Sequence, residues 1–345
     1  MLKNKRFLIG LAISLILLAL FLWRTDFSAM WHALKQAKYV FLIPGVLIYC
    51  CGICFRSLRW QFFLKPLGNF SALRLFPLVV IGFLVNNVLP GRLGIIARAY
   101  MLGEREGISK MSVGGTLVAE QIFDGVTLLL FALCVSFSAH LSGDVATVVY
   151  VAAGLFSFAL LLCFALALSQ RFTRKAISLL LVVLPKRWHR TVEGLLLRLV
   201  AGLGFMRSPK RMITVLVLSA VVWLCEAGLF YMAALSFNLQ QPFYIIMLVT
   251  AVSNLSWALI FTPGGVGSFD IACQTTLMLF VPAGIAAAAY KGKVTAYVLV
   301  VHSILLFPVI ILGFIFLWRE NLSLSKIVGG RGAMGKKQDA EVDKK

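Results

Sequence analysis

The chain alternates long apolar runs with short connections that hold most of its charged residues. A helix needs about 20 apolar residues to cross the hydrocarbon core of a bilayer. Nine runs reach or approach that length: Phe7–Trp23, Tyr39–Phe55, Leu73–Pro90, Met111–Phe137, Val145–Leu168, Met212–Phe237, Phe243–Pro263, Phe269–Tyr290 and Val294–Trp318. The pattern therefore predicts an all-α polytopic membrane protein, in which no soluble stretch is long enough to form a catalytic domain.

Composition agrees with this class. Of the 345 residues, 61% are hydrophobic and 13% are charged, against about 45–50% and about 25% in soluble domains. The net charge of +20 could suggest nucleic acid, but the Lys and Arg residues flank apolar runs, so no nucleic-acid partner is expected. All seven cysteines lie in apolar stretches, and Cys51 and Cys54 have no second Cys or His pair nearby. Neither a metal nor another cofactor is therefore expected.

The distribution of Lys and Arg predicts the orientation, because short cytoplasmic loops are enriched in both residues. Segments assigned to the cytoplasm hold 26 of them, including ten in 169–211 and seven from Arg319 onward, whereas external segments hold five. The connections 140–144 and 238–242 hold none and are predicted to lie outside. We therefore expect a multi-pass protein of the cytoplasmic (inner) membrane with both termini in the cytoplasm.

This orientation requires two segments to enter the membrane and return to the same side. Segment 72–110 must start and end inside, and 243–290 must start and end outside. Too few residues lie between Pro90 and Glu104 for a second crossing, so 72–110 is predicted to be a re-entrant helical hairpin. The run Phe269–Tyr290 is long enough to span, so the prediction of a second hairpin there rests on symmetry between the two halves.

The symmetry is visible as a repeated motif, P-G-x-x-G, at residues 90–94 and again at 263–267. Each half then reads helix, helix, re-entrant hairpin, helix, in opposite orientations, which makes six full spans plus two hairpins. An inverted repeat with paired broken helices is typical of transporters. The predicted parts are a first repeat over 1–140, a second over 141–320 with interfacial helices in 169–211, and a disordered cytoplasmic tail over 321–345.

Charged residues near the first break are the main candidates for binding a substrate. Arg92 and Arg98 follow the break, where a helix N-terminus and two guanidinium groups suit a phosphate; the alternative is that both reach to lipid headgroups. Glu120 and Asp124 are four residues apart and share one helix face. They are expected either to pair with these arginines or to meet a cationic part of the substrate or relay a proton.

The remaining candidates lie at the two breaks, at the end of the run Tyr39–Phe55 and deep in the run Met212–Phe237. Arg59, together with Arg56, is interpreted as a snorkelling side chain at the cytoplasmic end of its run, but is kept as a candidate. No role is assigned to His302, which has no evident metal or catalytic companions. The other candidate substrate-binding residues are Asn87, Gly91, Glu226, Gly264, Gly265 and Asp270.

Four strings resemble the flippase-like membrane domain of the lysylphosphatidylglycerol synthase/flippase family. They are FRSLRW at 55–60, NNVLPGRLG at 86–94 followed by Arg98, AEQIFD at 119–124, and TPGGVG at 262–267. The resemblance implies a bacterial or archaeal inner-membrane protein. It also exposes three departures from the family pattern, at Ile95 and Asp270, where Glu is usual or frequent, and at Gln121, where Arg is usual. The departures at Ile95 and Gln121 remove one charge of each sign, as if one salt bridge had been lost.

These features favour a lipid translocase that moves an anionic or aminoacylated phospholipid, or a polyprenyl-phosphate lipid. Arg92 and Arg98 would hold the phosphate. The alternative is a non-transporting membrane scaffold that regulates a lipid-modifying enzyme or a glycosyltransferase, with a partner bound through 169–211. The expected partners are membrane lipids with an anionic headgroup, and beyond them a second copy of the chain or a lipid enzyme. No enzymatic activity is expected.

Overall fold

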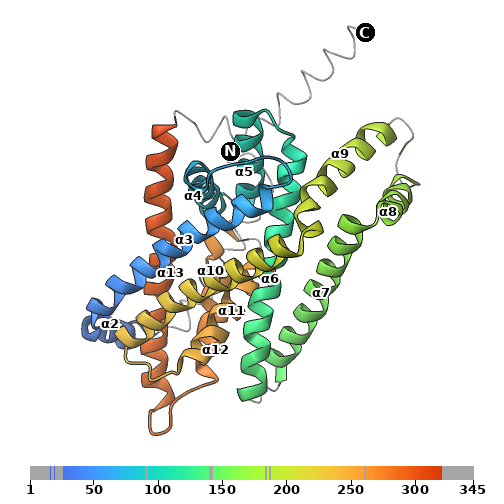
Figure 1. Cartoon of the computed structure of the whole chain (residues 1–345). Helices are drawn as coiled ribbons and strands as arrows, with labels where there is room; N and C mark the ends of the chain where they lie inside the picture. Colours follow the sequence, from blue (N-terminus) through green and yellow to red (C-terminus); the bar gives the residue numbers. More distant parts are fainter. Residues whose placement is uncertain are drawn as a thin grey trace.

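The computed structural model describes residues 26–89, 92–139, 143–182, 185, 188–259 and 262–320, together with Ile16 and Ala19. Every regular element in this part of the chain is a helix (Figure 1), which agrees with the predicted all-α class. The predicted first span over Phe7–Trp23 lies almost wholly outside the described residues. The predicted tail over 321–345 also lies outside them.

Four helices of the described part are long and apolar enough to cross a membrane. They include the cores of the predicted spans at Tyr39–Phe55, Met111–Phe137, Met212–Phe237 and Val294–Trp318. The helices are α3 (Leu42–Leu64, preceded by the 3-10 turn η1, Tyr39–Phe41), α6 (Lys110–Ala139), α10 (Pro209–Ser236) and α13 (Ala287–Arg319). A fifth helix of 26 residues, α7 (Gly143–Leu168), covers the run at Val145–Leu168.

Between the long helices lie two pairs of shorter ones. The first pair is α4 (Ala72–Val88) and α5 (Leu93–Glu106), and the second is α11 (Phe243–Leu259) and α12 (Ser268–Met278). The 11 residues of α12 extend about 16 Å at 1.5 Å per residue, half of the hydrocarbon thickness. The apolar run Phe269–Tyr290 is therefore not one spanning helix.

The packing of the two pairs determines where the central region of the molecule lies. Helix α4 packs on α5, and α11 packs on α12, so that each pair forms a hairpin. The two hairpins lie toward opposite ends of the molecule, and α3 and α10 run side by side obliquely between them (Figure 1). Each hairpin also contacts a long helix from elsewhere in the chain: α13 packs on α4, and α6 packs on α11. The hairpins and these long helices consequently enclose one central region.

The first hairpin is closed by a very near approach of its two helices. An added Cβ atom at Gly94 would lie 2.0 Å from the carbonyl oxygen of Gly82 and 2.5 Å from Asn86 Oδ1. Asn86 Oδ1 accepts a hydrogen bond of 2.8 Å from the backbone N–H of Gly94, one of the donors that a helix N-terminus leaves unpaired. Glycine at position 94 thus permits the contact that sets the spacing of α4 and α5.

The described part of segment 169–211 lies at the end of the molecule where the first hairpin lies, with its two helices at the periphery (Figure 1). It contains α8 (Gln170–Val182), α9 (His189–Ala201) and the 3-10 segment η3 (Gly202–Arg207). Its exposed apolar side chains include Phe172, Leu179 and Leu197, which alternate along the helices with exposed basic residues. This arrangement is typical of helices that lie in the plane of a membrane surface.

Candidate functional site

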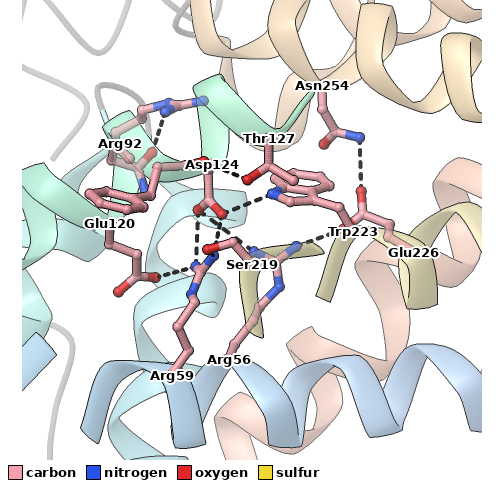
Figure 2. Close-up of polar contacts among 12 residues, drawn as sticks. Arg56, Arg59, Arg92, Glu120, Asp124, Thr127, Ser219, Trp223, Glu226 and Asn254 are labelled. Carbon is pink, nitrogen blue, oxygen red and sulfur yellow. Dashed lines mark hydrogen bonds and ion pairs between the residues drawn. The ribbon is translucent and has the colours of Figure 1, made fainter. Parts of the chain in front are cut away.

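Arg59 of α3 lies at the centre of a buried ion-pair cluster, shown in Figure 2. Its side chain is 0% exposed. One guanidinium nitrogen lies 2.5 Å from Asp124 Oδ1 on α6 and donates to Ser219 Oγ on α10 at 2.9 Å, and the other lies 3.1 Å from Asp124 Oδ2. The second nitrogen is also 3.4 Å from Glu120. Arg59 therefore connects three long helices, and the interpretation of its side chain as snorkelling is wrong.

Arg56 is one helical turn before Arg59 and is buried as well, with 8% of the residue exposed. It donates to Glu226 Oε2 on α10 at 2.7 Å, and its guanidinium lies 4.8 Å from the ring centre of Trp223. Glu226 Oε1 accepts a second hydrogen bond, of 2.8 Å, from the side-chain amide of Asn254 on α11. The snorkelling interpretation also fails for Arg56, because Glu226 and Trp223 of α10 are partners that replace water.

Arg98 of α5 forms a bidentate pair with Glu120 of α6, with N–O distances of 3.1 and 3.0 Å. Its guanidinium carbon lies 4.1 Å from the ring centre of Trp60. This contact confirms the interpretation that an acid of α6 pairs with an arginine of the hairpin. Bidentate geometry is among the strongest arrangements for this pair of groups, so the contact holds α5 against α6.

Arg92 differs from the other three arginines because its partner is neutral. It donates to Gln121 Oε1 at 2.7 Å, and its guanidinium lies 5.6 Å from the ring centre of Trp257 on the opposite hairpin. Within the described residues it forms no ion pair. Its backbone φ of 51° is in the left-handed region, which is strained for a residue with a long side chain and occurs often at functional sites.

The second break is held by a histidine that was assigned no role from the sequence. His302 Nε2 lies 2.8 Å from the carbonyl oxygen of Gly264, and Nδ1 lies 2.6 Å from Asp270 Oδ1. Asp270 Oδ2 accepts from the backbone N–H of Gly267 at 2.8 Å. Gly264 and Gly265 have φ values of 60° and 77°, which glycine adopts readily. The polar ring of His302 inside an apolar run was the available signal for this contact.

A cavity of about 510 Å³ opens between the two hairpins, within the usual size range of small-molecule sites. Five of the predicted candidates line it: Asn87, Arg92, Asp124, Glu226 and Gly264. Another five do not line it: Arg59, Arg98, Glu120, Gly265 and Asp270. Gly91 lies outside the described residues. Sequence reasoning did not select the lining residues Arg56, Trp223, Trp257 and His302 as binding groups.

Fold and site together define a polytopic helical membrane protein with a charged internal cavity between two short-helix hairpins. Residues 7–313 match the family described as the lysylphosphatidylglycerol synthase TM region. The chain belongs to this family, as the motif resemblance indicated.

Curated relatives are distant but cover most of the chain. The UPF0104 membrane protein PH1989 of Pyrococcus horikoshii is 22% identical over 81% of this chain and 88% of its own length. A UPF0104 membrane protein of Methanothermobacter thermautotrophicus is 24% identical over 80% and 84%, respectively. Glycosyltransferase AglD of Haloferax volcanii is 25% identical over 81% of this chain but only 50% of its own length. No solved structure matches the chain.

Proposed function

We propose that the protein is a lipid translocase that carries a phosphate-containing lipid headgroup through the central cavity. The observation that supports this most directly is the cavity itself, which lies between two opposed hairpins and is lined by Arg56, Arg92, Asp124 and Glu226. Charged groups at membrane depth are costly and usually serve a substrate or ion. The lipid tails remain in the bilayer while the headgroup enters the cavity.

An inverted repeat is part of this proposal. The two P-G-x-x-G motifs are 173 residues apart, from Pro90 to Pro263. When the same offset is added to the residue numbers, the ranges of α3, α4, α5 and α6 fall close to those of α10, α11, α12 and α13, respectively. In the proposed topology, six spans surround two re-entrant hairpins, which enter the inner membrane from opposite sides while both termini face the cytoplasm. Rocking one half against the other would open the cavity to each side in turn.

The ion pairs have a mechanical role in this mechanism. Arg56 contacts Glu226 on α10 and lies 4.0 Å from Asp124 on α6, so it lies between acids of two helices. A phosphate bound to Arg92 would join this network by one further charge-assisted contact, with Arg56, which lines the same cavity. Headgroup binding can therefore change the balance of contacts between α3, α6 and α10, the helices that would move.

Reconstitution tests the proposal directly. Purified protein is placed in vesicles that contain fluorescently labelled phosphatidylglycerol, and quenching by dithionite reports how quickly label leaves the inner leaflet. We expect faster exchange than in protein-free vesicles and a reduction of about tenfold in Glu226→Gln, because the substitution removes a charge-assisted contact with Arg56. The control, Arg74→Gln, changes an exposed arginine and should exchange like wild type. Exchange no faster than in protein-free vesicles would refute translocation.

A second candidate function is a membrane scaffold for a lipid-modifying enzyme or a glycosyltransferase. The supporting observation is that the relative named glycosyltransferase AglD matches this chain over only half of its length, with further sequence beside the shared region. A scaffold would use the exposed layer formed by α8 and α9. Co-purification of such an enzyme that is lost when this layer is altered, with unchanged binding in Arg92→Gln, would favour this function over translocation.

A further inference from the structure

We propose that the cavity selects a headgroup whose single net negative charge lies on a phosphate, and that it rejects an aminoacylated headgroup with an added ammonium. The inference rests on the proposed translocation and narrows its substrate class. It distinguishes two classes of lipid that the sequence analysis kept as alternatives, the anionic phospholipids and the aminoacylated phospholipids.

The balance of charge in the cluster is the first observation. Four arginines and three carboxylates meet at the cavity and behind its wall: Arg56, Arg59, Arg92 and Arg98 with Glu120, Asp124 and Glu226. The closest contacts pair Arg56 with Glu226, Arg59 with Asp124, and Arg98 with Glu120. One positive charge, on Arg92, therefore has no compensating carboxylate in the described part of the cluster.

The second break adds no charge to this balance. The carbonyl oxygen of Gly264 can only accept, so His302 Nε2 must donate to it. The 2.6 Å contact between His302 Nδ1 and Asp270 Oδ1 needs one proton between the two atoms. Whether that proton resides on nitrogen or on oxygen, the pair is neutral overall. The surplus positive charge on Arg92 therefore determines the sign of the site.

Arg92 also retains hydrogen-bonding capacity. A guanidinium has five N–H donors in a planar fork, and the contact with Gln121 uses one terminal nitrogen. The guanidinium carbon lies over the ring of Trp257, and the edge of the guanidinium that is not bonded to Gln121 remains available to a ligand in the cavity. A phosphate can accept two parallel bonds from such an edge, which makes Arg92 the natural contact for the headgroup.

The carboxylates that line the cavity are already engaged. Both oxygens of Asp124 accept from Arg59, and Oδ1 also accepts from Trp223 Nε1 at 2.8 Å. Glu226 accepts from Arg56 and Asn254, one on each oxygen. An entering ammonium group would have to displace an arginine or an amide while it faces the surplus charge on Arg92. The same cavity thus favours the phosphate and disfavours the amine.

Binding to the full chain in detergent, measured by native mass spectrometry, tests the selectivity. The probes are short-chain phosphatidylglycerol, lysyl-phosphatidylglycerol and inorganic phosphate, added separately and in competition. We expect phosphatidylglycerol to bind about tenfold more tightly than the lysyl form, the ratio that one charge-assisted contact typically contributes. Equal or tighter binding of the lysyl form would overturn the proposal. So would binding of inorganic phosphate without binding of phosphatidylglycerol.

Two variants address the surplus charge in different ways. Arg92→Gln removes it, and Gln121→Glu keeps Arg92 but places a carboxylate of similar size beside it. Both should abolish the preference for phosphatidylglycerol, whereas Arg74→Gln should retain it. Persistence of the preference in both cavity variants would overturn the assignment to Arg92. Gln121→Glu keeps Arg92 and adds an ion pair, so its result does not depend on whether Arg92→Gln folds.

Flip assays with each labelled lipid separate this inference from the proposed function. Selective binding of phosphatidylglycerol without movement of either lipid would leave the selectivity standing and refute translocation. Movement of both lipids at equal rates would leave translocation standing and refute the selectivity. Faster movement of phosphatidylglycerol, reduced about tenfold in Gln121→Glu, is the result that supports both.

Discussion

At the scale of single residues, the centre of this protein depends on arginines that each have a polar and an aromatic partner. Every arginine of the cluster donates to a side-chain oxygen and lies over an aromatic ring. Aromatic faces attract cations more strongly where water is excluded. Because a guanidinium keeps its charge in proteins, burying it is favourable only where such partners replace water. The ring contacts therefore belong to the same structural unit as the ion pairs.

Arg59 gives the sharpest prediction at this scale. Arg59→Met removes the partner of both Asp124 oxygens and should destabilise the protein by about 3–5 kcal/mol, the usual cost of leaving a buried charge uncompensated. Thermal unfolding in detergent measures the loss, with the exposed-site variant Arg74→Met as control. Adding Asp124→Leu to Arg59→Met removes the unpaired charge and should restore part of the stability. A double variant less stable than the single one would contradict this account.

The sequence identified most of these residues but not their environment. Arg56 and Arg59 follow the apolar run that ends at Phe55, and a charge at the end of a run suggests a membrane surface. The helix continues to Leu64, however, and acids from α6 and α10 meet the arginines there. Because those partners are far away in sequence, no local pattern distinguishes a snorkelling arginine from a buried one.

At the scale of elements, the two hairpins are the features that determine the cavity. The P-G-x-x-G motifs located both breaks correctly, because proline and glycine end helices for reasons that are local to the backbone. The end of α12 was not predicted. Pro282 and Gly284 lie between α12 and α13, and Gly284 has a φ of 81°, but apolar neighbours concealed this turn in a hydropathy count.

The contact inside the first hairpin can be tested with a single methyl group. Gly94→Ala places a carbon 2.0 Å from the carbonyl oxygen of Gly82, so α4 and α5 must separate and the wall of the cavity must shift. We expect a lower thermal-unfolding midpoint and slower lipid exchange. Gly114→Ala in α6 is the matched control, since nothing lies within 4 Å of the added carbon and alanine is the better helix former. Equal behaviour of the two variants would argue against a tight hairpin.

At the scale of the whole molecule, exposed apolar side chains indicate which surfaces face lipid. On α13 the exposed residues Phe307, Ile311, Ile315 and Trp318 recur every three or four positions, so they form one stripe along the helix. Exposed apolar side chains also occur on α7 and α10. A surface of this kind is unfavourable in water and favourable in hydrocarbon. The ion-pair cluster, by contrast, is buried in the interior, the reverse of the arrangement in a soluble protein.

This arrangement leads to a prediction about which loops share a side of the membrane. Single cysteines are introduced at four exposed positions, in a background where the seven native cysteines are replaced: Asn69→Cys, Glu106→Cys, Pro242→Cys and Ala283→Cys. The first two flank α4 and α5, and the last two flank α11 and α12. An impermeant maleimide on intact cells should label only the last two, because Lys and Arg are concentrated on the cytoplasmic side.

Permeabilising the cells should make all four cysteines reactive, which controls for sites that are buried in the folded protein. The comparison within each pair tests re-entry, since a hairpin returns both ends to one side whatever the absolute orientation. If Glu106→Cys were labelled from outside while Asn69→Cys was protected, α4 and α5 would together cross the membrane, and the first hairpin would not be re-entrant. If both pairs exchanged sides, the hairpins would stand and only the orientation would be reversed. The cavity would then still lie between two opposed hairpins, because its walls depend on helix packing and not on which compartment each loop faces.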